Sequence, residues 1–193
     1  MFTIAEIVDM AIMAVAIGFI FKDIPLFNVI RTSYSGIPLA KGPSNFLLAI
    51  YSIVPGIILH ELFHKFSAIY YGAEAVFVAN YTFLLIGIAI KLLKFPFILI
   101  APAYVAITAA NGLAGHERAL IGFAGPFANL LLYIAAFIIV KYDFKIFRKI
   151  KDNPYGYTIL VGTRYINGFL FLFNMLPIPG FDGYHVMRGL LMS

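Results

Sequence analysis

The stretch 57-IILHELFHKFSAIYYG-72 places His60, Glu61 and His64 in a largely apolar run. Ionisable groups are costly to bury in hydrocarbon, so a metal ion or a hydrogen-bonding partner must compensate them. The four-residue spacing of the two histidines puts both imidazoles on one face of a helix, one turn apart. Glu61 lies about 100° round the helix from His60, where it can reach a water without binding the ion.

This spacing is the H-E-x-x-H pattern of zinc hydrolases, in which the glutamate is the general base. The imidazole ligands and the hydrolytic pattern favour one zinc ion, with iron and cobalt as the other candidates. The alternative is that the histidines only bridge helices by hydrogen bonds, which would leave Glu61 without a partner. A catalytic zinc also needs a third protein ligand and an open coordination position.

The composition indicates an all-α polytopic membrane protein. The chain has 193 residues, of which 62% are hydrophobic and 12% charged, too few polar residues to cover a soluble domain of this size. Its net charge of +5 comes from basic residues between apolar segments rather than from a basic stripe, which argues against nucleic-acid binding. The absence of cysteine excludes disulfides and thiolate metal sites.

We expect about four to five transmembrane helices and a single domain over residues 1–193. The clear spans are, in chain order, 3–21 with Glu6 and Asp9 at its wet end, 45–71 ending at Gly72, 119–140, and one beginning near 157. The last span runs into 174-NMLPIPGFDG-183, where prolines and glycines must break the helix. The apolar segment 81–110 is interrupted by lysines and prolines, so it is either one broken span or a re-entrant loop followed by a short β-hairpin.

The third ligand is sought among the remaining acids and histidines. Asp182 follows the broken helix, which could carry a carboxylate to the ion, although an ordinary turn role before glycine is equally open. His185 is the runner-up. Glu74 lies beyond the end of the predicted helix that carries His60 and His64. The loop residues His116 and Glu117 are expected to be exposed to solvent.

Three motifs together resemble the site-2 protease family of intramembrane zinc metalloproteases. They are 60-HELFH-64, 125-GPFAN-129 and 174-NMLPIPGFDG-183, and the last matches the family signature N-x-x-P-x-P-x-x-D-G in full. Their order and spacing agree over roughly 45–190, which the resemblance marks as the catalytic core, with 3–21 as an additional span. Phe63 departs from the pattern, because many family members have glycine there.

The resemblance implies that His60, His64 and Asp182 bind the zinc ion and that Glu61 is the catalytic acid/base. The expected enzyme is a multi-pass protein of the cell membrane that hydrolyses a peptide bond in or near a transmembrane segment of a membrane-protein substrate. Its partners are then that substrate and the lipid bilayer, with no nucleic acid.

Extended substrate must be held by the enzyme, because the carbonyl groups of a transmembrane helix are already hydrogen-bonded. An edge strand within 97–110 could pair with substrate, and the amides of Asn129 and Asn174 could contact its backbone. Interhelical hydrogen bonding is the alternative role for both asparagines, and Asn174 could also cap the broken helix.

Two other functions fit parts of the sequence. One is a zinc-binding membrane protein without protease activity, an inactive homologue or scaffold. The other is a small transporter that uses ionisable residues as a metal or proton relay, which predicts intramembrane carboxylates besides Glu61 and Asp182.

The basic loops bear on membrane orientation. Segments 22–44 and 141–157 carry eight Lys and Arg residues between them, and they share one face only if 81–108 is re-entrant. The positive-inside rule would make that shared face cytoplasmic, whereas the family resemblance implies the opposite.

Overall fold

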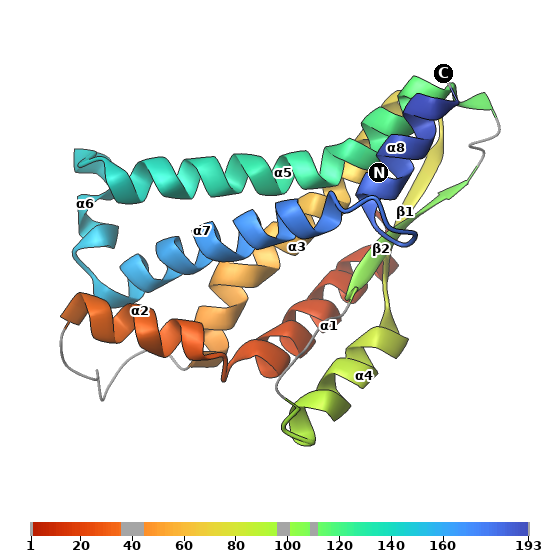
Figure 1. Ribbon diagram of the computed structural model, residues 1–193. Coiled ribbons are helices and arrows are strands. Elements are labelled where there is room, and N and C mark those ends of the chain that lie inside the picture. The colour runs from red at the N-terminus through yellow and green to blue at the C-terminus, as the bar shows by residue number, and fades with distance from the viewer. Residues whose placement is uncertain (1, 36–44, 96–100, 109–111, 193) are drawn as a thin grey trace.

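A computed structural model describes residues 2–35, 45–95, 101–108 and 112–192 (Figure 1). It is mostly helical, with one small sheet. The elements are α1 (Ile4–Phe21), α2 (Pro25–Ser35), α3 (Asn45–Tyr70), β1 (Glu74–Ala79), α4 (Tyr81–Leu92), β2 (Ala103–Thr108), α5 (Gly115–Lys141), α6 (Lys145–Lys151), α7 (Pro154–Asn174) and α8 (Asp182–Leu191).

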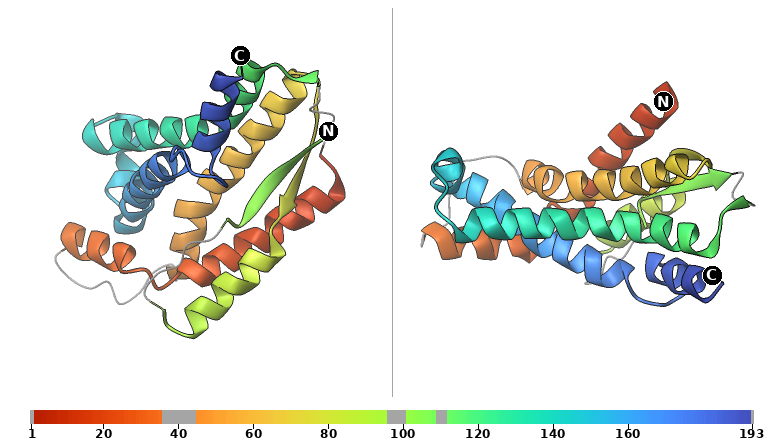
Figure 2. Two further views of the ribbon diagram at one scale, coloured as in Figure 1. Left: turned by 45° about the vertical axis from the view of Figure 1, so that its right-hand side comes forward. Right: turned by 90° about the horizontal axis from the view of Figure 1, so that it is seen from above.

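Helices α3, α5 and α7 pack against one another and form the body of the molecule. The antiparallel helices α5 and α7 are joined at one end by α6, and α2 lies at that same end (Figure 1). Helix α8 lies alongside the N-terminal half of α5 in both views of Figure 2. Helix α1 packs against α3 and β1 on the other side. The chain thus gathers the second half of α3, the first half of α5 and the start of α8 at one end of the bundle.

The helix boundaries follow local signals. Thr3 and Glu6 form a capping box at the start of α1, and Asn153 caps α7 by accepting hydrogen bonds from the backbone nitrogens of its first turn. The predicted break is confirmed, because α7 ends at Asn174 and α8 begins at Asp182. Gly180 between them has φ of +97°, a conformation that glycine adopts without strain.

The two strands form an antiparallel sheet in which Glu74 pairs with Thr108 and Ala79 with Ala103. The hairpin offered for 81–110 as one of two alternatives is therefore not the pairing observed for β2. This strand pairs with β1, which the sequence analysis did not predict. Asn80 donates to the carbonyl oxygen of Pro102 at 2.9 Å, so the intervening segment leaves the sheet and returns to the same place. That segment is an excursion through α4, and its residues 96–100 lie outside the described part of the chain.

Within the described residues, three helices, α1, α3 and α5, are long and apolar enough to cross a membrane. The predicted count of four to five spans is not confirmed. Large apolar side chains on these helices face outward, as they do in proteins surrounded by lipid. Examples are Ile7, Ile12 and Val15 on α1 and Leu131, Ile134 and Ile138 on α5.

Glu6 does not lie at a wet end of α1, because its side chain is only 1% exposed. It accepts hydrogen bonds from Lys65 Nζ, from the backbone of Phe77 at 2.8 Å and from the backbone of Thr3 at 2.8 Å. These three hydrogen bonds, one of them from a charged lysine, offset the free-energy cost of burying the Glu6 carboxylate. One residue of α1 is thereby joined to both the zinc-motif helix and the sheet.

Candidate metal centre

His60 and His64 project from the second half of α3 on the same side of the helix, as their spacing predicts. Their Nε2 atoms are 3.1 Å apart, and each residue is 8% exposed. Asp182, the first residue of α8, completes the group. Its Oδ2 lies 3.1 Å from His60 Nε2, and its Oδ1 lies 3.2 Å from His64 Nε2. The break between α7 and α8 thus brings a carboxylate to two imidazoles more than a hundred residues earlier in the chain.

These three residues fit a tetrahedral zinc site. Zinc bonds to imidazole nitrogen and carboxylate oxygen of about 2.0–2.1 Å separate neighbouring ligand atoms by roughly 3.3 Å. His60 Nε2 lies 3.1 Å from His64 Nε2 and 3.1 Å from Asp182 Oδ2, close to that separation, and the other carboxylate oxygen lies 3.2 Å from His64 Nε2. One ligand atom from each of the three residues lies within 4.8 Å of the other two. In the described part of the chain, this is the group of histidine and acidic residues that could hold one metal ion.

Hydrogen bonds on the far side of each ring select the nitrogen that faces the site. His60 Nδ1 donates to Asn129 Oδ1 at 2.7 Å, and His64 Nδ1 donates to the carbonyl oxygen of Ile121 at 2.7 Å. Both acceptors are oxygen atoms, so Nδ1 carries the proton and Nε2 keeps a lone pair for a metal. Helix α5 therefore supplies an orienting partner for each ring.

Asn129 is fully buried and bonded on both ends of its amide. Its Nδ2 donates to the carbonyl oxygen of Gly56 at 3.1 Å and to Asn167 Oδ1 at 2.9 Å. Asn167 in turn donates to the carbonyl oxygen of Thr163 at 2.8 Å. The network links α3, α5 and α7, so Asn129 has the interhelical bonding role that was the alternative to substrate contact.

Gly125 provides the close approach of α5 to the imidazoles. A Cβ at this position would come within 2.7 Å of His60 Nε2 and closer still to His64 Nε2. Real carbon atoms do not approach that closely, so a side chain here would fill the space of the ligand atoms. Gly125 and Asn129 belong to the same 125-GPFAN-129 motif. Gly125 leaves space for both imidazoles, and Asn129 hydrogen-bonds to His60.

A cavity of about 860 Å³ opens beside the metal ligands. Glu61, 8% exposed, lines it together with the three ligand residues. Asn174, at the end of α7, also lines it. One strand, β2, contributes to its wall through Ala103, Tyr104, Val105 and Ile107.

The other candidate residues lie outside the ligand group. Glu117 caps α5 by accepting from the backbone of Ala114 at 2.8 Å, and His116 is exposed. Glu74 accepts from Thr108 Oγ1 at 3.3 Å in the sheet. His185 lines the cavity one turn beyond Asp182 but is not among the clustered ligand atoms.

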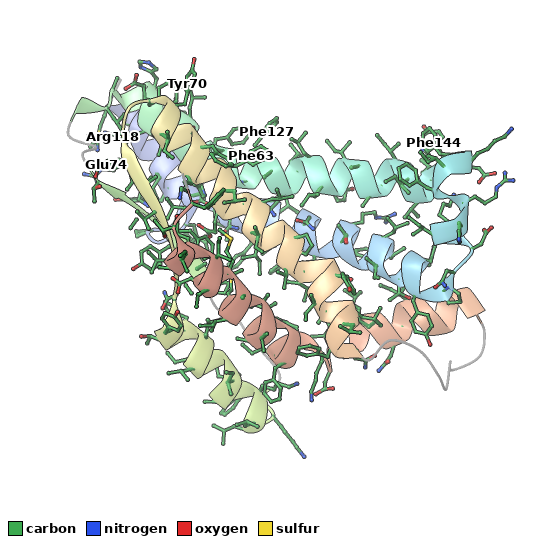
Figure 3. All side chains as sticks on the ribbon, turned by 180° about the vertical axis from the view of Figure 1, so that it is seen from behind. Phe63, Tyr70, Glu74, Arg118, Phe127 and Phe144 are labelled. Atoms are coloured by element: carbon green, nitrogen blue, oxygen red, sulfur yellow. The ribbon has the colours of Figure 1, made fainter. Side chains whose placement is uncertain are left out.

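Phe63 faces away from the ligands, as the helical spacing predicts. It lines a separate apolar groove between α3 and α5 together with Phe127. Figure 3 shows both phenylalanines on the outer surface of these helices. A phenylalanine at this position therefore leaves the metal ligands in place.

The sequence is similar to that of a known protein over nearly its whole length. It is 35% identical over 187 residues to a protein of Methanocaldococcus jannaschii named "Putative zinc metalloprotease". The match covers 97% of this chain and 85% of that protein. No family model and no solved structure matches the chain.

Proposed function

The chain belongs to the family of this archaeal zinc metalloprotease, and from that premise we propose that it is an intramembrane zinc metalloendopeptidase of the site-2 protease type. The observation that carries the proposal is that His60, His64 and Asp182 cluster into one possible metal-binding group, in the same cavity as Glu61. This group lies among helices whose apolar surfaces suit lipid. Its substrate is a transmembrane segment of another membrane protein, and its location is the cell membrane.

Each residue has a distinct role in the proposed hydrolysis. His60, His64 and Asp182 would hold the zinc ion, which would supply a Lewis acid to the site. Glu61 takes a proton from the attacking water while the water oxygen bonds to the scissile carbonyl carbon. When the C–N bond breaks, Glu61 gives the proton to the leaving amine. The products are a carboxylic acid and an amine, with no covalent enzyme intermediate.

The sheet suggests how substrate is held in extended form. One edge of β1 pairs with β2, and its other side is bonded by α1, where Glu6 accepts from Phe77 N at 2.8 Å and Asp9 from Ala79 N at 3.0 Å. Both sides of β1 are therefore already hydrogen-bonded. Residues of β2, and none of β1, line the cavity. We propose that an unwound stretch of substrate lies along β2, with its backbone beside Glu61.

The proposal also covers the extent of the catalytic unit. Residues 45–190 contain the three motifs, and α1 adds the contacts to α3 and β1.

The transporter alternative gains no support from Glu6, because this carboxylate is bonded to Lys65 away from the cavity.

The proposal is tested with the full-length protein in phosphatidylcholine vesicles. Its zinc content is measured by mass spectrometry, and cleavage is assayed on a pool of single-span peptides with randomised flanking residues. The wild type is expected to hold one zinc ion and to cut within or beside the span. Glu61→Gln is expected to keep the zinc ion and lose at least about a thousandfold in rate, as when an essential proton-transfer group is removed.

Asp143→Asn, at the exposed far end of the molecule, is the matched control and keeps both properties. A wild-type protein that holds zinc but cleaves no member of the pool would instead indicate the inactive, zinc-binding alternative.

A further inference from the structure

The metal cavity has a cationic mouth formed by Arg118 of α5 and Arg188 of α8. Both arginines line the same cavity as the metal ligands, and both are exposed. Arg118 Nε donates to the carbonyl oxygen of Leu113 at 3.1 Å, which holds its guanidinium at the cavity edge. Figure 3 places Arg118 at the end of the molecule that carries the sheet, opposite Phe144.

Packing between α5 and α8 brings together the backbone positions next to the two arginines. Gly189 lies directly against α5, because a Cβ there would be 2.7 Å from the backbone nitrogen of Ala119. Arg188 precedes Gly189, and Arg118 precedes Ala119, so each arginine is the sequence neighbour of a residue in this helix–helix contact. The same wall continues inward, where Gly122 approaches His185, with 3.2 Å between an added Cβ and His185 Cβ.

The distance from the metal ligands to the arginines follows from helix geometry. Arg118 precedes Gly125 by seven residues, and Arg188 follows Asp182 by six, which at about 1.5 Å per residue gives roughly 9–11 Å along each helix. A peptide in extended form covers about 3.3 Å per residue. A side chain about three residues from the scissile bond would therefore lie beside the guanidinium groups.

The charge balance of the described cavity lining favours an acidic partner. Among its described lining residues, the acids are Glu61 and Asp182, and the Lys and Arg residues are Arg118 and Arg188. The two carboxylates offset the double charge of a zinc ion, so the mouth carries a net charge of about two positive units when zinc is bound. A guanidinium at such a mouth pairs well with a carboxylate.

We propose that this cationic mouth selects substrates with an aspartate or glutamate about three residues from the scissile bond. This inference rests on the proposed protease function and adds a substrate class to the same site. Arg188 makes the principal contact, since its α8 position follows directly from that of Asp182, and Arg118 supports it from α5.

The experiment uses the randomised single-span peptides in vesicles of phosphatidylcholine, with and without phosphatidylglycerol, and the cut position is read by mass spectrometry. The wild type is expected to enrich acidic residues roughly two- to fivefold at one position three to four residues from the cut, the range for an exposed charge pair. Arg188→Glu should reverse the preference to Lys or Arg at that same position. Lys149→Gln, an equally exposed change on α6, should keep the wild-type preference.

A binding measurement separates recognition from the chemical step. With Glu61→Gln, fluorescence anisotropy should give a lower dissociation constant for a peptide with glutamate at that position than for its glutamine counterpart. Arg188→Glu in the same background should abolish or reverse the difference.

The outcomes distinguish this inference from the proposed function. Cleavage by the wild type without an acidic preference, or with one unchanged by Arg188→Glu, would overturn the inference and leave the protease function standing. An Arg188→Glu effect that needs phosphatidylglycerol and is equal for all peptides would assign the arginines to lipid headgroups and also overturn it. Absence of all cleavage in zinc-loaded wild type would overturn both.

Discussion

His60 is oriented by Asn129: the imidazole Nδ1 lies 2.7 Å from the amide oxygen, and the asparagine is fully buried. The two residues come from different helices, α3 and α5, and the amide nitrogen of Asn129 bonds to α3 and α7. A single side chain therefore sets the tautomer of a metal ligand and the spacing of three helices. This arrangement makes the metal site sensitive to a residue that does not touch the ion.

Asn129→Ala is expected to weaken zinc binding by roughly ten- to a hundredfold, as for other partners that orient ligands. His60 would lose the acceptor that keeps its Nε2 lone pair toward the metal. The measurement is zinc transfer to a competing chelator of known affinity. Asn174→Ala, which removes an amide from the cavity wall but not from a ligand, should retain wild-type affinity. Equal losses in both variants would contradict the orienting role.

Gly125→Ala is expected to reduce zinc binding at least tenfold, because the new Cβ would come within 2.7 Å of His60 Nε2. The imidazoles or helix α5 would have to move apart. Gly112→Ala is the matched control, since nothing lies within 4 Å of a Cβ at that position. The chelator competition and a thermal unfolding curve check both variants, and unchanged zinc affinity in Gly125→Ala would show that the close contact is not needed.

Glu6→Gln is expected to destabilise the protein by about 3–5 kcal/mol, because it leaves the Lys65 ammonium buried without a counter-charge. The side chains of this pair are 1% and 3% exposed. The free energy of unfolding is measured by denaturant titration in micelles. Replacing both residues, by Glu6→Gln with Lys65→Met, should recover part of the loss, because it removes the unpaired charge.

The surface pair of Asp23 and Lys91 provides the comparison for this buried pair. Its atoms are 2.6 Å apart, but the Asp23 side chain is 65% exposed. Asp23→Asn is therefore expected to cost less than about 1 kcal/mol. Similar losses in Glu6→Gln and Asp23→Asn would mean that burial of the first pair has no energetic consequence.

Zinc itself is expected to stabilise the folded protein. At a free zinc concentration a thousand times the dissociation constant, binding to the native state alone contributes about 4 kcal/mol. Removal of zinc by a chelator should lower the melting temperature, and Asp182→Ala should remove this dependence. Asp143→Asn, outside the cavity, should keep it. A chelator effect that persists in Asp182→Ala would place the stabilising metal elsewhere.

The local sequence predicted the parts of the metal site that local geometry controls. The four-residue spacing of His60 and His64 on a helix already places both rings together, and prolines with Gly180 force the break before Asp182. The resemblance of three motifs to a known family then implied that Asp182 is the third ligand, and its placement 3.1 Å from His60 agrees with that prediction.

The sheet and the buried ion pair could not be predicted in the same way. In 74-EAVFVA-79 the residues after Glu74 are all apolar, so the alternation between buried and exposed positions leaves no trace in the sequence. Its partner strand β2 comes only after the excursion through α4. The sequence predicts a wet helix end for Glu6, because its partners, Lys65 and the backbone of Phe77, are about sixty to seventy residues away in the chain.

The sequence by itself determined the apolar helices, the two histidines on one helical face and the glutamate beside them, because these depend on composition and on the period of the helix. Only the tertiary structure decided what surrounds them: the carboxylate that completes the ligand group, the asparagine and glycine of α5 that fit the rings, and the arginines at the cavity mouth. Those contacts join residues far apart in the chain, and they depend on how the helices pack, which no local pattern encodes.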